Sequence, residues 1–277
     1  MGAVQWVLWL LGYPGLMWGL ILTLLMGRVA GAHLPGGGLR RGLRAVAAGG
    51  APVALLLAAL LPLAALSFLP WPLVQQPLAA AQYNLLLFWG FLEASFVLAL
   101  LPGLISASPY APRAAMREAQ IGFAGRMVLW LAVGVALAAG PWFEMRAIPV
   151  KLLALATMLL VLPAAAAWGP FSATGGITPG GAEAGLGRAA IDLARWGRWV
   201  RLMALASLAV LAVLPEPALI AGPLRLGLAV LALALIAIAL RALRGRLAGR
   251  PLPDALRYCW WRALPLALLG IVVLLLG

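Results

Sequence analysis

The sequence predicts an all-α fold: a polytopic transmembrane bundle of about eight helices. Hydrophobic residues make up 65% of the 277 residues and charged residues 10%, and the mean hydropathy is +1.06. A soluble domain is nearer half apolar and a quarter charged, so lipid is the solvent that suits this chain. Apolar runs long enough to cross a bilayer recur along the chain, and the basic residues gather in alternate loops between them.

Each apolar run of about 20 residues is expected to form one span. The first run has no basic segment before it and is too long for the apolar region of a signal peptide, so we expect it to span as well. The whole chain, 1–277, is then a single integral membrane domain. The expected spans are 4–27, 46–69, 84–106, 121–141, 148–169, 200–217, 224–242 and 262–277.

The basic residues predict the orientation. The loops after the first, third, fifth and seventh spans, with the helix ends beside them, hold 17 of the 20 lysines and arginines; the other three are Arg146, Lys151 and Arg225. Because positive loops stay on the cytoplasmic side, both termini are expected outside. The net charge of +13 is then an orientation signal, and no nucleic acid is expected as a partner.

The longest loop, 171–200, is expected on the cytoplasmic side. Its first half is rich in Thr, Gly and Pro, and it then becomes an amphipathic basic helix, AIDLARWGRWVRL, over 190–202. Arg195 and Arg198 recur there at helical spacing with tryptophans between them, which is typical of a helix lying at the membrane interface. Interface anchoring and docking of a partner both fit this pattern. A short surface helix is also expected around 39–48.

Several kinds of site lack the residues they need. Cys259 is the only cysteine and His33 the only histidine, so no disulfide can form within the chain and a Cys/His metal site would lack ligands. A Ser-His-Asp arrangement would have to use His33, which lies in a Gly-rich loop with no acid near in sequence. Phosphate-loop, HExxH and CxxC motifs are missing from the sequence. A self-contained soluble active site is therefore not expected.

Three glutamates are candidates for an ion path, because ionisable groups at membrane depth are costly and usually functional. Glu93 lies well inside the third span, where a proton relay and a neutral, hydrogen-bonded glutamate are both reasonable. Glu118 follows Arg117 near the start of the fourth helix, where an interfacial charge cluster is equally compatible. Glu183 is the only acid in the Gly-rich half of the long loop, and Asp192 follows it in the basic helix.

Several stretches resemble one known family. Residues 82–120, QYNLLLFWGFLEASFVLALLPGLISASPYAPRAAMREAQ, are similar to that family's third span, its Ser-Pro-Tyr turn and a following helix with an arginine and an acid. Residues 175–205 resemble its long acidic loop and keep a Thr-Pro and a Glu-Ala pair. Residues 252–270 are similar to its closing segment, with Arg-Tyr, Trp and then Leu-Pro. The first loop, GRVAGAHLPGGGLRRGLRAV, is similar in composition to that family's first loop, which is also rich in Gly-Arg and Gly-Pro.

The chain resembles the membrane subunit 1 family of respiratory complex I, which includes the equivalent membrane subunits of formate hydrogenlyase and energy-converting hydrogenases. The resemblance implies a membrane-anchoring and ion-coupling subunit of an NADH–quinone oxidoreductase or hydrogenase in a prokaryotic plasma (inner) membrane. It implies iron–sulfur partners with quinone-site or nickel–iron subunits, and antiporter-like membrane subunits. No cofactor is expected on this chain alone, and a quinone would lie at the interface with partners. Electron transfer, hence the enzymatic step, would occur in those partners. The residues expected to dock them are Arg113, Arg117, Asp192, Arg195 and Arg198.

The sequence departs from the family pattern in its acids. The chain has only seven acidic residues, and the second acid expected in the fourth helix is replaced by Ala124-Gly125-Arg126. Two alternatives therefore stay open. One is a structural anchor that has lost ion coupling, and the other is a stand-alone transporter in which Glu93 binds a cation and prolines break the helices.

Overall fold

The computed structural model describes residues 11–30, 44, 46, 50–73, 81–172, 181–215, 219–244 and 251–276. All regular elements in these ranges are helical, which confirms the predicted all-α class. The main helices are α2 (Leu16–Val29), α4 (Ala51–Ala65), α5 (Ala81–Leu104), α6 (Ala111–Ala138), α7 (Ala147–Ala165), α8 (Arg188–Val213), α9 (Gly222–Arg244), α10 (Leu252–Arg257) and α11 (Leu264–Leu276). Short turns of 3-10 helix, η1 (Leu66–Phe68) and η4 (Gly181–Glu183), and a π-helical turn, Tyr258–Ala263, extend or join them.

Seven of these helical segments are long and apolar enough to cross a membrane. They are Ala51–Phe68, Tyr83–Leu104, Ala111–Ala138, Ala147–Ala165, Arg188–Val213, Gly222–Leu243 and Leu252–Leu276. The predicted first span corresponds to α2, which is apolar and has 14 residues; residues 4–10 of that prediction lie outside the described ranges. Most of the surface helix expected at 39–48 also lies outside them. The chain is a multi-pass membrane protein.

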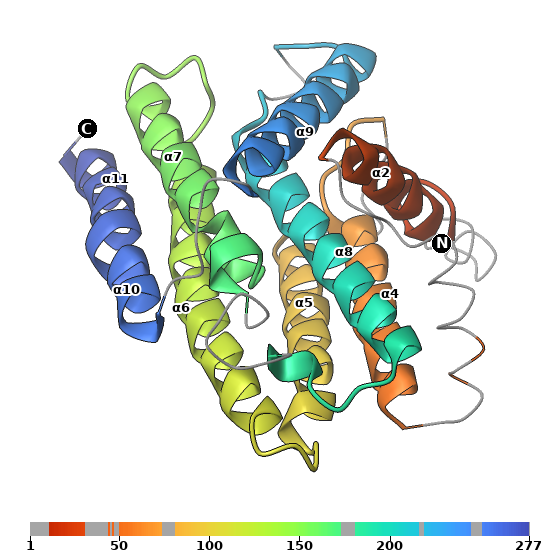
Figure 1. The fold of residues 1–277 in the computed structure, drawn as a ribbon. Helices are drawn as coiled ribbons and strands as arrows, with labels where there is room; N and C mark the ends of the chain where they lie inside the picture. Colours follow the sequence, from red (N-terminus) through yellow and green to blue (C-terminus); the bar gives the residue numbers. More distant parts are fainter. Residues whose placement is uncertain are drawn as a thin grey trace.

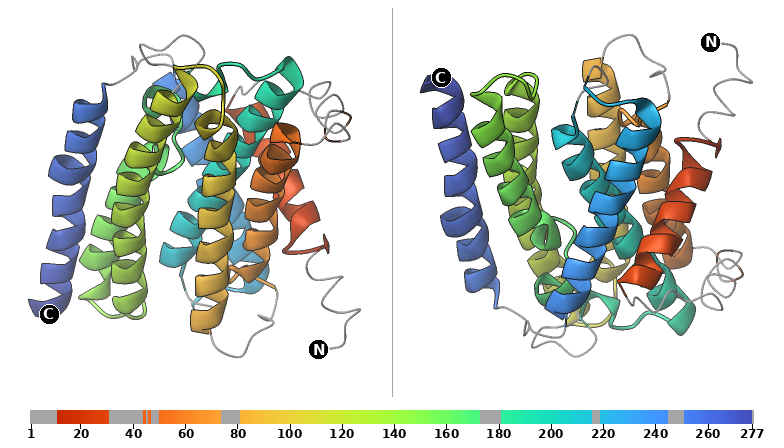
Figure 2. Two further views of the ribbon diagram at one scale, coloured as in Figure 1. Left: turned by 90° about the horizontal axis from the view of Figure 1, so that it is seen from below. Right: turned by 90° about the horizontal axis from the view of Figure 1, so that it is seen from above.

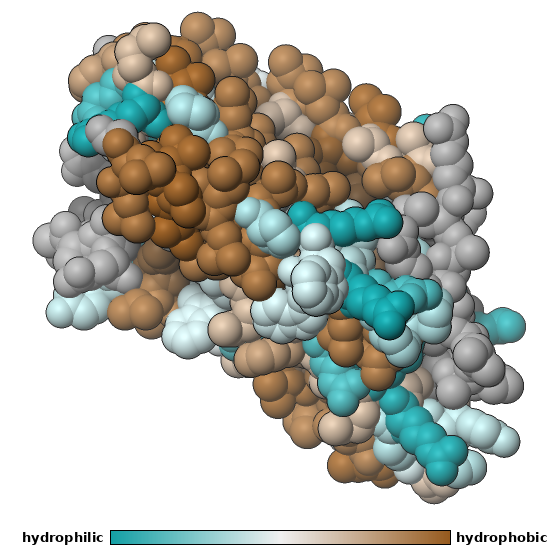
Figure 3. Space-filling model, turned by 90° about the vertical axis from the view of Figure 1, so that its left-hand side faces the viewer, coloured by the Kyte–Doolittle hydropathy of each residue, from teal (hydrophilic) through white to brown (hydrophobic). Residues whose placement is uncertain are grey.

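The helices run side by side, up and down through one bundle (Figures 1 and 2). α4 pairs with α5 and α6 pairs with α7, while α8 packs against both pairs and against α2 and α9. Consequently 17 of the 26 residues of α8 are buried, whereas α11 keeps most of its surface outward. Figure 3 shows a broad hydrophobic surface on the side of the molecule seen at the left of Figure 1, with hydrophilic side chains gathered toward its ends.

One end of the bundle collects most of the cations. α5 ends there, and α6, α8 and α10 begin there, whereas α2 begins and α11 ends at the opposite end (Figure 2). We call this the basic end. The alternation of charge between loops is thus a separation between the two ends of the bundle. The described arginines near the basic end include Arg28, Arg113, Arg117, Arg188, Arg195, Arg198, Arg241 and Arg257.

Several predicted boundaries were wrong, and the last membrane-spanning segment begins at Leu252 and not at residue 262. The fourth membrane helix begins at Ala111 and not at residue 121, so Arg117 and Glu118 lie within α6. The basic stretch 190–202 is not a separate helix at the interface, because it forms the first half of α8. Its tryptophans pack inside the bundle: Trp199 is 4% exposed and donates from Nε1 to the carbonyl oxygen of Thr23 at 3.1 Å. Around these tryptophans, protein neighbours take the place of the lipid headgroups that the prediction assumed.

Candidate functional site

A partly buried salt bridge joins the middles of α5 and α6. Nε of Arg126 donates to Oε1 of Glu93 at 2.8 Å, and the two side chains are 6% and 30% exposed. Glu93 lies about halfway along α5, and Arg126 lies about four turns into α6, so the pair sits deep in the bundle. Glu93, predicted from its isolated position in an apolar run, is therefore paired with an arginine.

A second group of charges lies closer to the basic end, between α6, α8 and η4. Arg198 contacts both Glu118, at 3.6 Å, and Glu183. Arg195, one turn earlier on α8, approaches Glu183 at 3.5 Å. Glu118 and Glu183 are only 3% and 6% exposed, whereas the side chain of Arg195 is 63% exposed. This group therefore leads from the surface into the interior.

Arg201 lies between the two groups. It follows Arg198 by three residues, so both side chains project from the same face of α8. Its Nη1 donates to the carbonyl oxygen of Ser95 at 3.4 Å, and its guanidinium carbon lies 5.4 Å from the centre of the Phe96 ring. The guanidinium carbon of Arg126 lies 3.6 Å from the same ring centre. Arg201 is attracted by Glu118 and Glu93 and repelled by Arg198 and Arg126, so it stands between the inner pair and the outer group.

These six side chains form what we call the charge row. From the basic end inward its members are Glu183, Arg198, Glu118, Arg201, Arg126 and Glu93. Three carboxylates and three guanidinium groups balance one another formally. They come from α5, α6, α8 and η4, so four segments far apart in sequence must pack together before the row exists (Figure 1).

Stability does not account for the charge row. Taking an ion out of water costs several kcal/mol, and a buried pair often does no better than apolar residues of the same volume. Some donors of the row also have no hydrogen-bond partner among the described residues: Nε and Nη2 of Arg201 and Nη1 of Arg126. Buried polar atoms of this kind need water or a moving partner, which favours a functional role.

An apolar groove of about 370 Å³ reaches the inner end of the charge row between α5 and α6. Glu93 and Arg126 are its charged lining residues, and the rest of the lining is Leu85, Leu86, Trp89, Phe123, Met127 and Trp130. Glu93, at 30% side-chain exposure, is the member of the inner pair that reaches outward. The row therefore runs from the basic end to the flank of the bundle at mid-helix depth.

The three predicted ion-path glutamates come together with arginines in one row. Arg126 and Arg201 were not predicted as members of it. The signal that could have found them is the same one that found Glu93: a charge inside an apolar run, as in WVRLMAL and FAGRMVLW. Arg198, predicted to dock a partner, is instead 11% exposed and occupied by two glutamates. Because α8 turns this side chain toward the interior, docking of a partner by Arg198 stays a prediction.

The other predicted docking residues lie near the basic end. Arg113 is exposed in the first turn of α6, and Asp192 is half-buried in the first turns of α8. Arg117 donates to the carbonyl oxygen of Ser172 at 3.1 Å and so fastens α6 to the segment after α7. Arg195 is the most exposed cation that touches the charge row. These side chains are placed where a partner could reach them.

Within the described ranges, no group of three or more His, Cys, Asp or Glu side chains could hold a metal ion. Cys259 is buried. No protein-family model matches the chain, and no curated protein matches it.

Proposed function

We propose that this chain is the membrane-anchoring and ion-coupling subunit of a complex-I-like NADH–quinone oxidoreductase or energy-converting hydrogenase. In this proposal a peripheral redox module docks at the basic end, and antiporter-like subunits lie beside the bundle. Electrons move through iron–sulfur and quinone-site or nickel–iron subunits, and a quinone would lie where those partners meet this chain. The resemblance over residues 82–120, 175–205 and 252–270 supports the class of complex.

The single observation that carries the proposal is the charge row. It begins at the basic end with Glu183, next to the exposed Arg195, and ends at Glu93 about halfway along α5. Unit charges about 4 Å apart interact by about 4 kcal/mol at an effective dielectric constant of about 20. Protonation or displacement of Glu183 would therefore change how strongly Arg198 pairs with Glu118. Each following side chain of the charge row would then change its own pairing in turn. A partner that pushes on the outer end could in this way shift the protonation of Glu93.

The transporter alternative receives less support. A cation bound to Glu93 would have to displace Arg126, which already donates to that carboxylate at 2.8 Å, and would meet a second guanidinium at Arg201. Like charges so close in a water-poor site oppose cation binding. The structural-anchor alternative shares the docking role with our proposal, so an experiment must separate the two.

The first test is composition. The full chain, tagged in its native host and extracted in mild detergent, is expected to bring iron–sulfur subunits with it, together with either quinone-site or nickel–iron subunits. Mass spectrometry of the purified complex would identify them. Recovery of this chain alone, from membranes in which it is abundant, would contradict the proposal.

The second test is coupling. Glu93→Gln, Glu118→Gln and Glu183→Gln would be compared in membrane vesicles energised with the donor that the co-purified redox subunit oxidises. Each variant is expected to keep electron transfer but lose proton or sodium uptake, because a neutral amide cannot pass the charge change inward.

The matched control is Glu144→Gln. Glu144 also pairs with an arginine at 2.8 Å, Arg146, but at the opposite end of the bundle and with 32% of its side chain exposed. Its loss should leave ion uptake unchanged. Unchanged ion uptake in all three row variants would contradict ion coupling and leave an anchor alone.

A further inference from the structure

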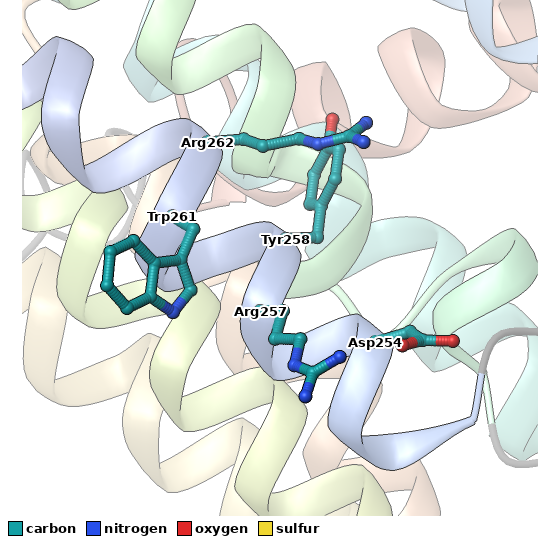
Figure 4. Close-up of a pocket in the computed structure, with 5 residues that line it drawn as sticks. All are labelled: Asp254, Arg257, Tyr258, Trp261 and Arg262. Atoms are coloured by element: carbon teal, nitrogen blue, oxygen red, sulfur yellow. The ribbon is translucent and has the colours of Figure 1, made fainter.

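A pocket of about 380 Å³ opens beside the start of the last membrane helix, away from the charge row. Figure 4 shows the side chains that line it, all from one helical segment: Asp254, Arg257, Tyr258, Trp261 and Arg262. Four of the five are exposed at the surface, and the fifth, Tyr258, is half-buried and contacts the neighbouring helix. With two arginines and one aspartate the pocket is formally cationic, so an anion is the complementary occupant.

A π-helical turn places the two arginines on the same pocket. Arg257 and Arg262 are five residues apart, and in a regular α-helix they would point about 140° away from each other. Residues 258–263 form a π turn, in which the backbone bonds five residues back, so side chains at this spacing lie closer in angle than they would in an α-helix. Pro265 supplies a cause, since it has no N–H for the carbonyl of Trp261 and its ring crowds that carbonyl.

Tyr258 is a fixed wall of the pocket. Its hydroxyl donates to the carbonyl oxygen of Leu160 at 3.1 Å, and its ring packs on Phe171 with centroids 5.4 Å apart. The guanidinium carbon of Arg262 lies 6.0 Å from the centre of the same ring, so the cation lies along a rigid aromatic face. Contacts of this kind restrain the arginine side chain but do not neutralise its charge, so the guanidinium group can still bind an anion.

The surroundings define the rest of the occupant. Trp260 and Trp261 are 41% and 79% exposed at the start of the helix, which is typical of side chains at the headgroup level of a bilayer. Directly beyond them the helix presents Leu268, Leu269 and Val272, each 48% exposed. A molecule that fills the pocket therefore needs an anionic head at the level of Arg257 and apolar chains beside α11.

We propose that this pocket binds an anionic phospholipid, with the phosphodiester held between Arg257 and Arg262 and the acyl chains lying along α11. Basic pockets at the membrane surface favour such headgroups. The inference does not depend on the proposed function.

The test is native mass spectrometry of the full-length protein in detergent, titrated with phosphatidylglycerol and, separately, with phosphatidylcholine. Wild-type protein is expected to prefer phosphatidylglycerol. Arg257→Gln together with Arg262→Gln should reduce that preference by about fivefold for each arginine removed. The control is Arg28→Gln with Arg113→Gln, two exposed arginines near the same basic end, which should keep the preference.

Inorganic phosphate separates a lipid site from a site for a free anion. Millimolar phosphate is expected to leave phosphatidylglycerol bound, because it lacks the acyl chains. Displacement of the lipid by phosphate would overturn the lipid assignment. Equal preference in the wild type and the Arg257/Arg262 variant, with circular dichroism showing that both are folded, would overturn the site itself.

Discussion

Arg201 is the side chain on which the continuity of the charge row depends. It is 3% exposed and stands between the outer group around Arg198 and the inner pair around Arg126. Glu118 compensates its charge more than Glu93 does, and two guanidinium nitrogens of Arg201 have no hydrogen-bond partner among the described residues. A cation in that position is stable only as long as the carboxylates around it remain charged.

This dependence predicts a rescue. Glu118→Gln should destabilise the protein by about 3 kcal/mol, because it leaves Arg198 and Arg201 buried without their shared counter-charge. Arg201→Met in the same chain removes the surplus cation, so the double variant should be more stable than Glu118→Gln alone. Thermal unfolding in detergent, followed by circular dichroism, measures both. A strictly additive double variant would contradict the coupling between the two residues.

The exposed pair between Glu144 and Arg146 provides the comparison. Solvent screens it, so Glu144→Gln should change stability by less than about 1 kcal/mol. A loss as large as that of Glu118→Gln would mean that burial is not what makes the charge row costly to disturb.

α6 and α7 approach each other closely at Gly125. A Cβ atom built on Gly125 would lie 2.5 Å from the backbone nitrogen of Ala165 and 2.8 Å from the carbonyl carbon of Ala164. Only a residue without a side chain lets the two backbones come this close, as in other small-residue contacts between membrane helices. Arg126, the next residue along α6, reaches Glu93 on α5.

Gly125→Ala should therefore push α6 away from α7 and cost about 1–3 kcal/mol. Gly134→Ala, on the same helix, meets no atom within 4 Å and should stabilise the helix by up to about 1 kcal/mol through its better helix propensity. Detergent melting curves of the two variants should shift in opposite directions. Equal shifts would contradict the packing argument.

At the level of the bundle, the two ends differ in charge, which predicts orientation. With Cys259 replaced by serine, a cysteine at Ala107 marks the α5–α6 loop at the basic end, and one at Ala221 marks the opposite end. Because basic loops stay in the cytoplasm, a membrane-impermeant maleimide should label Ala221→Cys in intact cells and reach Ala107→Cys only after permeabilisation. The reverse pattern would remove the docking surface from the side where redox partners reside.

The number and order of the membrane helices were largely readable from the residues alone. Apolar runs report their own burial in lipid wherever they occur, and the alternation of arginines marks which loops share an end. Glu93, Glu118 and Glu183 were found in the same way, because a charge in or beside an apolar run is conspicuous whatever surrounds it. Each of these features depends on local composition, so the amino-acid sequence is enough to detect it.

Partners across the bundle could not be read in this way. Nothing in the sequence ties Glu93 to Arg126, or Arg198 to two glutamates 80 and 15 residues away, because those pairings depend on which helix faces turn toward each other. The same holds for α8, whose basic, tryptophan-rich start has the composition of an interfacial helix but turns Trp196 and Trp199 into the bundle. Hydropathy distinguishes lipid from water. It does not distinguish lipid from protein, so the assignment of a charge to a surface or to an interior required the packed bundle.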